Sequence, residues 1–247
     1  MQGVLIYSAA EAKRNAFVVE KYLKELPLRL VLSEELTLQE KADFVVNRTD
    51  DWRIAAAFEQ RGVRVFNNST VSRIANDKAL AYDFMQSHGV EVLPVNYTGF
   101  PAVLKKSFSK GGKDVHLIRS PEELPKDLLG WVLQQSCDTP GKDLRVYVLG
   151  GEIVVSCLRT GSGFLSNYCL GGRAEVYCLN AAERAAVQKV IGLFDFDFVG
   201  IDFLFHQGKL VFNEIEDAVG ARMVYDLTDL DIVSMYCRYI LKQVSGA

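Results

Sequence analysis

The feature that constrains this chain most is a pair of acidic, strand-like segments near its C-terminus. The first segment, VGIDFLF over 199–205, carries Asp202, and the second, LVFNEIE over 210–216, carries Glu214 and Glu216. Both segments are rich in apolar residues that favour β-strands, and the residues between them favour a turn. Carboxylates in such strands are costly unless their charge is compensated. The two segments therefore predict a β-hairpin, here called the acidic hairpin, whose three carboxylates need charge compensation.

The length of the turn decides whether the three carboxylates share one face of the hairpin, because side chains alternate between faces with period two. A three-residue loop over 206–208, with its glycine left-handed, would pair Phe205 with Lys209 and put all three on one face. Three converging oxygen donors suit a Mg²⁺ ion that carries phosphates. A two-residue loop over 207–208 would instead put Asp202 on the opposite face. A solvated acidic sheet face is the alternative that this pattern leaves open.

Length, composition and charge are those of an ordinary globular protein. The chain has 247 residues, of which 49% are hydrophobic and 24% charged, and its formal net charge is −3. This charge disfavours general electrostatic binding to nucleic acid or to anionic membranes. The sequence contains no apolar stretch near the roughly 18–20 residues that cross a bilayer, and its N-terminus resembles a first strand rather than a signal peptide. We expect a cytoplasmic protein without a nucleic-acid or membrane partner, and the sequence leaves a homo-oligomer open.

Strand and helix patterns alternate in the first part of the chain and are β-rich in the last part. Strands are predicted at 4–8, 28–32, 43–47, 63–66, 101–106, 115–118, 131–135, 144–151 and 152–159. Helices are predicted at 11–26, 51–61, 77–87, 181–194 and 229–243, with a helix or turn at 121–129. The alternation over the first 75 residues indicates a parallel sheet with crossover helices, a small Rossmann-like unit. The fold class is therefore α/β (α+β).

Basic residues in the middle of the chain are candidates for binding phosphates. Lys78 follows a predicted helix start, Lys105 lies in an apolar strand, and KGGK over 110–113 forms a loop whose backbone N–H groups could cover phosphates. Arg145 and Arg159 lie in strands, and arginine prefers planar anionic partners. Taken singly, such features are more often solvated lysines, plain hairpin turns or surface ion pairs.

The order of these features resembles the ATP-grasp superfamily, and specifically its RimK-like glutamate-ligase branch. The matching segments cover nearly the whole chain: VNRT at 46–49, FNNS at 66–69, NDK at 76–78, SHGVE at 87–91, VLK at 103–105 with SKGG at 109–112, GKDLRVYVLGG at 141–151, Arg159, SN at 166–167 with GG at 171–172, GID at 200–202 and NEIE at 213–216. The resemblance implies an ATP-grasp fold in three parts. These are a Rossmann-like pre-ATP-grasp domain over 1–75, a small central and lid subdomain over 76–138, and a C-terminal α+β subdomain with the metal site over 139–247.

The resemblance also implies which residues bind ATP and metal. In this family ATP lies between two α+β units, and its adenine is held near a hinge. The positions that match nucleotide-binding residues are Lys78, Lys105, Gly111, Gly112, Gln135, Ser136, Asp143, Ser166 and Asn167. Asp202, Glu214 and Glu216 match the metal ligands. The implied cofactors are ATP and Mg²⁺, as one ion or two, with Mn²⁺ able to substitute.

The implied activity is that of an ATP-dependent carboxylate–amine ligase, which forms an amide or peptide bond on an amino acid or peptide through an acyl phosphate. The partners would be small-molecule or peptide carboxylate and amine substrates. Arg159 and Arg145 would stabilise the tetrahedral oxyanion and the departing phosphate. Arg222 would lie near the reacting groups and hold a substrate carboxylate in a two-pronged contact.

Three positions depart from the family's pattern. Gln135 stands where glutamate is usual, Leu165 where arginine is usual, and Glu216 where asparagine is usual. These departures keep open a non-catalytic ATP-binding regulatory protein of the same fold. A phosphotransferase that stops at the phosphorylated substrate is a further alternative.

Overall fold

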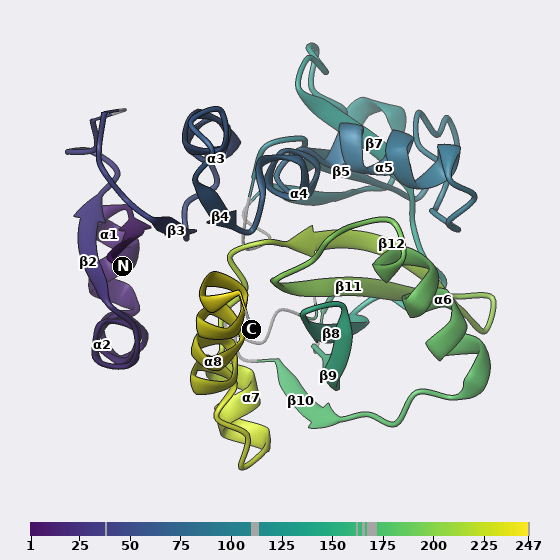
Figure 1. Ribbon diagram of the computed structural model, residues 1–247. Helices are drawn as coiled ribbons and strands as arrows, with labels where there is room; N and C mark the ends of the chain where they lie inside the picture. Colours follow the sequence, from purple (N-terminus) through teal and green to yellow (C-terminus); the bar gives the residue numbers. More distant parts are fainter. Residues whose placement is uncertain (38, 110–113, 162, 165, 167–171, 247) are drawn as a thin grey trace.

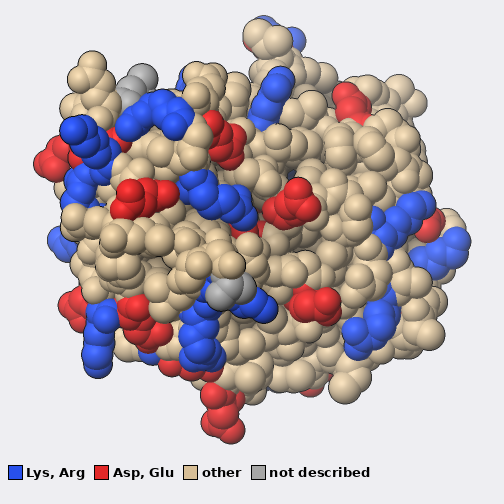
Figure 2. All heavy atoms as spheres, in the orientation of Figure 1, with Lys and Arg blue, Asp and Glu red and all other residues tan. Residues whose placement is uncertain are grey.

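The strands of the protein form three separate sheets (Figure 1). The computed structural model describes residues 1–247 except 38, 110–113, 162, 165, 167–171 and 247. Within the described residues, no helix is both long and apolar enough to span a membrane. Basic and acidic side chains are interspersed over the face seen in Figure 2.

The first sheet is parallel, with the strand order β2-β1-β3-β4. Its elements are β1 (Gly3–Tyr7), α1 (Ala9–Arg14), α2 (Ala16–Glu25), β2 (Leu28–Leu32), β3 (Phe44–Asn47), α3 (Trp52–Glu59) and β4 (Arg64–Phe66). Every residue of β1 and β3 is buried, as expected for parallel strands covered on both faces. The predicted Rossmann-like alternation is confirmed. The predicted single helix over 11–26 is wrong, because the Asn15 amide donates to the Glu11 carbonyl at 2.8 Å and ends α1.

The second sheet is antiparallel and small, with the order β6-β5-β7. Its region contains α4 (Ser69–Ala75), α5 (Lys78–Ser87), β5 (Ala102–Lys106), β6 (Val115–Ile118), the 3-10 turn η1 (Pro121–Glu123) and β7 (Trp131–Gln135). Asp77 caps α5, since its side chain accepts from the backbone N–H groups of Ala79 and Leu80. The hydroxyl of Ser107, just after β5, donates to the same carboxylate at 2.5 Å. The start of α5 is thereby tied to the second sheet.

The third sheet has the order β10-β9-β8-β11-β12, and its strand pairs are antiparallel. Its region contains β8 (Lys142–Leu149), β9 (Glu152–Thr160), β10 (Arg173–Val176), α6 (Ala181–Ile191), β11 (Phe198–His206), β12 (Lys209–Glu216), α7 (Arg222–Leu227) and α8 (Ile232–Ser245). Helix α8 lies between the first and third sheets (Figure 1). Tyr22 of α2 and Tyr236 of α8 meet edge to face there, with ring centroids 6.1 Å apart. The two sheets therefore share one core.

Asp197, just before β11, ties these two sheets together through a buried carboxylate. It accepts hydrogen bonds from Arg64 of β4 at 2.5 Å and from the Tyr239 hydroxyl at 2.9 Å. Burial raises the pKa of Asp197 to about 6 from an ordinary 3.8, although Arg64 acts against the rise. Because the folded-state pKa is the higher one, the favourable contribution of this group is present below about pH 4. It is lost as the pH rises through about 6.

Asp197→Asn should remove this pH dependence while keeping a side-chain oxygen for both donors. As the pH rises from about 4 to about 7, the unfolding free energy of the unaltered protein should fall by about 3 kcal/mol more than that of the variant. Urea unfolding of both proteins across this range measures the difference. Parallel pH profiles would contradict the prediction.

Candidate active site

The turn of the acidic hairpin has two residues rather than the predicted three. His206 of β11 pairs with Lys209 of β12, so only Gln207 and Gly208 lie between the strands. Both have a left-handed backbone, with φ of 51° and 73°. Two successive left-handed residues match the twist of the flanking strands, which favours this tight turn. The predicted three-residue loop is therefore wrong, although the left-handed glycine is confirmed.

A β-bulge restores the convergence that a two-residue turn would have prevented. Phe203 pairs with Phe212, whereas Asp202 pairs with Glu214, so Asn213 is the extra residue on β12. One extra residue exchanges the faces of everything beyond it. Asp202 and Glu214 consequently lie directly opposite each other on one face.

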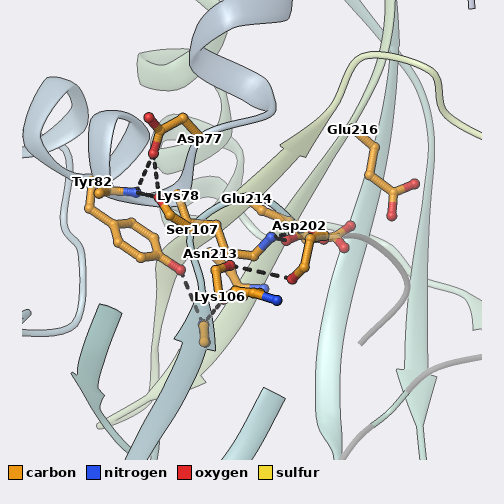
Figure 3. A network of polar contacts seen from close by, with 12 residues as sticks. Asp77, Lys78, Tyr82, Lys106, Ser107, Asp202, Asn213, Glu214 and Glu216 are labelled. Atoms are coloured by element: carbon orange, nitrogen blue, oxygen red, sulfur yellow. Dashed lines mark hydrogen bonds and ion pairs between the residues drawn. The ribbon is translucent and has the colours of Figure 1, made fainter. Parts of the chain in front are cut away.

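The three carboxylates form one compact group. Asp202, Glu214 and Glu216 each offer an oxygen that lies within 4.8 Å of the others, with Asp202 buried and the two glutamates half-buried. Figure 3 shows them on the same side of the hairpin. Hard anionic oxygens at this separation are the donors that Mg²⁺ or Mn²⁺ takes, so the donor set fits such an ion.

Two arginines link these carboxylates into a buried chain of alternating charges. Arg145 donates from Nε and Nη2 to the two oxygens of Asp202, both at 2.7 Å, and from Nη2 to Glu216 at 2.6 Å. Arg159 donates to Asp143 at 2.7 and 2.6 Å and to Asp202 at 2.7 Å. Strand pairing creates this order, since Asp202 lies opposite Arg145 and Asp143 lies opposite Arg159. The arginines are therefore held rigidly beside the three carboxylates.

The arginines keep Asp202 ionised. Burial alone would raise the pKa of Asp202, but the guanidinium groups of Arg145 and Arg159 outweigh burial and lower it to about 2. Burial raises the pKa of Asp143 despite its contact with Arg159. Asp202 is thus an anionic donor at neutral pH.

Two lysines approach the same group from the second sheet and α5. The Lys78 ammonium lies 3.2 Å from Glu214 and donates to the Ser109 carbonyl at 2.7 Å. Lys105 is buried. Burial lowers the pKa of Lys105 to about 8.

Lys105 donates to three side-chain oxygens that sequence reasoning missed. The acceptors are Gln134 and Asn213, each at 2.8 Å, and the Tyr82 hydroxyl at 3.1 Å. A signal existed for Gln134, because it alternates with buried Val132 and so lies on the inner face of β7. An amide on the inner face of an apolar strand needs a polar partner. Asn213 belongs to the NEIE segment at 213–216, but nothing in that segment predicted its contact with Lys105.

The structure does not bring every predicted residue to this group. Gln135 ends β7 and is half-buried, and Ser136 follows it. Ser166 is buried and hydrogen-bonds to Asp143. Arg222 is exposed at the first position of α7, and no polar contact around the three carboxylates within the described residues involves it. Gly111, Gly112, Leu165 and Asn167 lie outside the described residues.

Comparisons with known proteins identify the family. A family model of the RimK-like ATP-grasp domain matches residues 63–240. The uncharacterized protein MG011 of Mycoplasma genitalium is 26% identical over 257 residues, covering 94% of this chain and 89% of its own. A probable alpha-L-glutamate ligase of Haemophilus ducreyi is 25% identical, covering 76% of this chain and 70% of its own.

Solved structures show the same fold. The ATP-grasp ligase PsnB, complexed with a phosphomimetic variant of its minimal precursor, Mg and ADP, aligns with a TM-score of 0.72 at 14% identity. The alignment covers 98% of this chain and 99% of that one, which confirms the predicted ATP-grasp fold. Because the family model also matches more than half of the sequence, the chain belongs to the RimK-like ATP-grasp family.

Proposed function

We propose that the protein is an ATP-dependent carboxylate–amine ligase that forms an amide or peptide bond through an acyl phosphate, on an amino acid or peptide. The observation that carries this proposal is the convergence of three carboxylates with Lys78 and Lys105 in a RimK-like ATP-grasp fold. The relative from Haemophilus ducreyi, a probable alpha-L-glutamate ligase, supports the reaction class.

ATP and Mg²⁺ are the proposed cofactors, as one ion or two, with Mn²⁺ as a substitute. Asp202, Glu214 and Glu216 would hold the metal, which when bound supplies charge neutralisation of the phosphate oxygens. Lys78 and Lys105 would hold the phosphates. The ammonium group of Lys78 lies beside Glu214, and that of Lys105 lies beside Asn213. The residues proposed to complete the nucleotide site are Gly111, Gly112, Gln135, Ser136, Asp143, Ser166 and Asn167.

Arg145 and Arg159 are proposed to stabilise negative charge that develops during the reaction. Each uses Nε and Nη2 for its carboxylate partners, and within the described residues no hydrogen bond of either Nη1 group is found. Nη1 is the nitrogen proposed to donate to an oxyanion or phosphate while Nε and Nη2 keep their carboxylate contacts. Arg222 is proposed to bind a substrate carboxylate from its exposed position at the start of α7.

The three sheets support a division into three units. We place the boundaries at 1–75, 76–138 and 139–247, so that each unit contains one sheet. The proposed site then lies where the second and third units meet, since Lys78 and Lys105 come from one and the three carboxylates from the other.

A condensation screen tests the proposed function. The protein is incubated with ATP, Mg²⁺ and pairs of amino acids or short peptides, and ADP release and product mass are measured. We expect ADP only when an acid and an amine are both present, and a product with the summed mass less one water. ATP binding without turnover would instead support a regulatory protein. A phosphorylated product formed without an amine would support a phosphotransferase.

Lys105 predicts a pH dependence of ATP binding. Burial lowers the pKa of Lys105 to about 8, and a bound triphosphate would favour its protonated form. Affinity should therefore be highest below pH 8 and fall as the pH rises above it, because binding must then take up a proton. Calorimetric titration from about pH 7 to pH 9 measures this dependence.

Lys105→Met should weaken ATP binding by about ten- to a hundredfold, which corresponds to the loss of a charge-assisted hydrogen bond. It should also flatten the pH profile. A variant that keeps the slope of the unaltered protein would show that the slope comes from another group.

A further inference from the structure

The turn that follows the acidic hairpin is held in place by hydrogen bonds from several elements. Asn67 and Asn76 donate to its first residue, Asp217, at 2.8 and 3.1 Å. This 217–221 turn connects Glu216, the last residue of β12, to Arg222, the first of α7. Arg48 donates from Nη2 to the Val219 carbonyl at 2.6 Å. The Tyr147 hydroxyl of β8 donates to the next carbonyl, that of Gly220, at 3.1 Å. Two consecutive peptide groups of the turn therefore have fixed orientations.

Packing fixes the same turn against β11. The side chain of Val219 is buried, and it lies over Gly200, where a Cβ atom would come within 2.7 Å of it. Gly200 pairs directly with Glu216 across the hairpin. The position of Val219 is thus coupled to the strand pair that carries the three carboxylates.

Arg48 reaches this turn from the first sheet. It follows β3 at the carboxyl end of the parallel strands, and its backbone N–H donates to the Ile6 carbonyl at 2.9 Å. Ligands of open α/β sheets bind beyond this edge. The side chain of Arg48 crosses from that edge to the 217–221 turn, which brings the first sheet into contact with the connection between Glu216 and Arg222.

Arg48 places a positive charge in the protein interior, although the hydrogen bond to the Val219 carbonyl does not require a charged donor. The side chain is 7% exposed, and among the described residues it forms no ion pair with a carboxylate. Its Nε is buried without an acceptor, and its polar neighbours include the neutral phenols of Tyr22, Tyr7 and Tyr236, of which Tyr7 hydrogen-bonds to it. Burying an unpaired charge is costly, and a neutral amide could donate to the same carbonyl. This cost points to a role in the site rather than in stability.

We propose that Arg48 is a positioning residue for the proposed ligase reaction. By fixing the Val219 carbonyl it orients the middle of the 217–221 turn, beside the contacts of Asn67, Asn76 and Tyr147, and so contributes to the places of Glu216 and Arg222 on either side. Arg48 itself contacts neither the three carboxylates nor the two lysines. The inference rests on the proposed function, because it concerns the metal-binding competence of Glu216.

Mn²⁺ binding in the presence of ADP tests the role without knowledge of the substrates. Free Mn²⁺ is measured by electron paramagnetic resonance, and ADP affinity is measured separately in EDTA. Arg48→Gln should weaken Mn²⁺ binding by about tenfold or more, as loss of a supporting outer contact does. Its ADP affinity without metal should stay within about twofold, since the lysines are untouched. Arg48→Lys should recover part of the Mn²⁺ affinity.

Arg64→Gln is the matched control. Arg64 is also an arginine of the first sheet that reaches the third unit, but its partner is Asp197 rather than the 217–221 turn. We expect its Mn²⁺ and ADP affinities to equal those of the unaltered protein, even if its melting temperature falls as far as that of Arg48→Gln. A merely structural role of Arg48 would make the two variants alike, and that result would overturn the proposal.

Tyr147→Phe provides a second approach in case Arg48→Gln does not fold. It removes the hydrogen bond to the Gly220 carbonyl and should weaken Mn²⁺ binding in the same direction, with metal-free ADP affinity unchanged. If Arg48→Gln folds, an unchanged Mn²⁺ affinity of this variant would overturn the positioning role and leave the proposed function standing. If it does not fold, an unchanged Mn²⁺ affinity of Tyr147→Phe would have the same meaning. Absence of Mn²⁺–ADP binding in the unaltered protein would instead refute the proposed function, and the positioning role with it.

Discussion

Glu214→Gln is expected to reduce Mg²⁺-dependent ADP formation by at least about a hundredfold, since loss of even an outer-shell partner costs about 10–100-fold. Glu214 lies opposite Asp202 and 3.2 Å from Lys78, so the change removes both an anionic oxygen donor and the partner of a proposed phosphate-binding lysine. The amide has nearly the same shape, which leaves the bulge at Asn213 in place. The measurement is initial ADP release with the acid and amine that the condensation screen identifies.

Glu91→Gln serves as the control for this substitution. Glu91 is exposed and pairs with Lys209 at 3.8 Å, away from the three carboxylates. Its turnover should match that of the unaltered protein. Undiminished turnover of Glu214→Gln at ordinary Mg²⁺ concentrations would refute the metal role of Glu214.

Asp202→Asn is expected to lower the unfolding free energy by about 3–5 kcal/mol, the usual cost of breaking a buried ion pair. Asp202 accepts from both Arg145 and Arg159, and all three side chains are buried. Its removal leaves two guanidinium groups without their shared carboxylate. Chemical denaturation at pH 7 measures the loss, and Asp83→Asn, on an exposed position of α5, should change stability by less than about 0.5 kcal/mol.

The difference between Asp202→Asn and the unaltered protein should depend on pH. The pKa of Asp202 is lowered to about 2 from an ordinary 3.8, so its stabilising contribution is present above about pH 4. That contribution is lost as the pH falls through about 2, and the two unfolding free energies should converge there. A constant gap down to this pH would show that the carboxylate charge is not the source of the stabilisation.

Local sequence patterns predicted the strands in which apolar residues alternate or are continuous. Strands 28–32 and 115–118 form as predicted, because alternating or continuous apolar residues fix their faces. Helix α4, strand β10 and helix α7 were not predicted. Strand β10 is short and largely exposed, so its pairing with β9 depends on tertiary contacts rather than on its own sequence. Helices α4 and α7 have only seven and six residues, which gives too few turns for a periodic signal.

The three carboxylates and the two lysines were predicted as site residues, and the structure brings them together. The convergence was attributed to a three-residue turn, which was wrong. The residues at 206–208 fit a turn of two or of three residues, and nothing in the sequence marks Asn213 as the site of a bulge. The ion pairs of Arg145 and Arg159 were not predicted either. They require the register between β8, β9 and β11, which depends on the whole sheet. The roles proposed for both arginines and for Arg222 stay predictions.

The two-residue turn and the bulge together restrict how this hairpin can change in length. Each alone would reverse the side on which Asp202 emerges, and the two reversals cancel. Deleting Asn213 would remove the bulge and still leave Asp202 paired with Glu214 across a two-residue turn. Moving the extra residue from 213 into the turn would also keep the two acids on one face. Homologous hairpins that lack the residue at 213 should therefore lack the bulge and still keep the two acids paired.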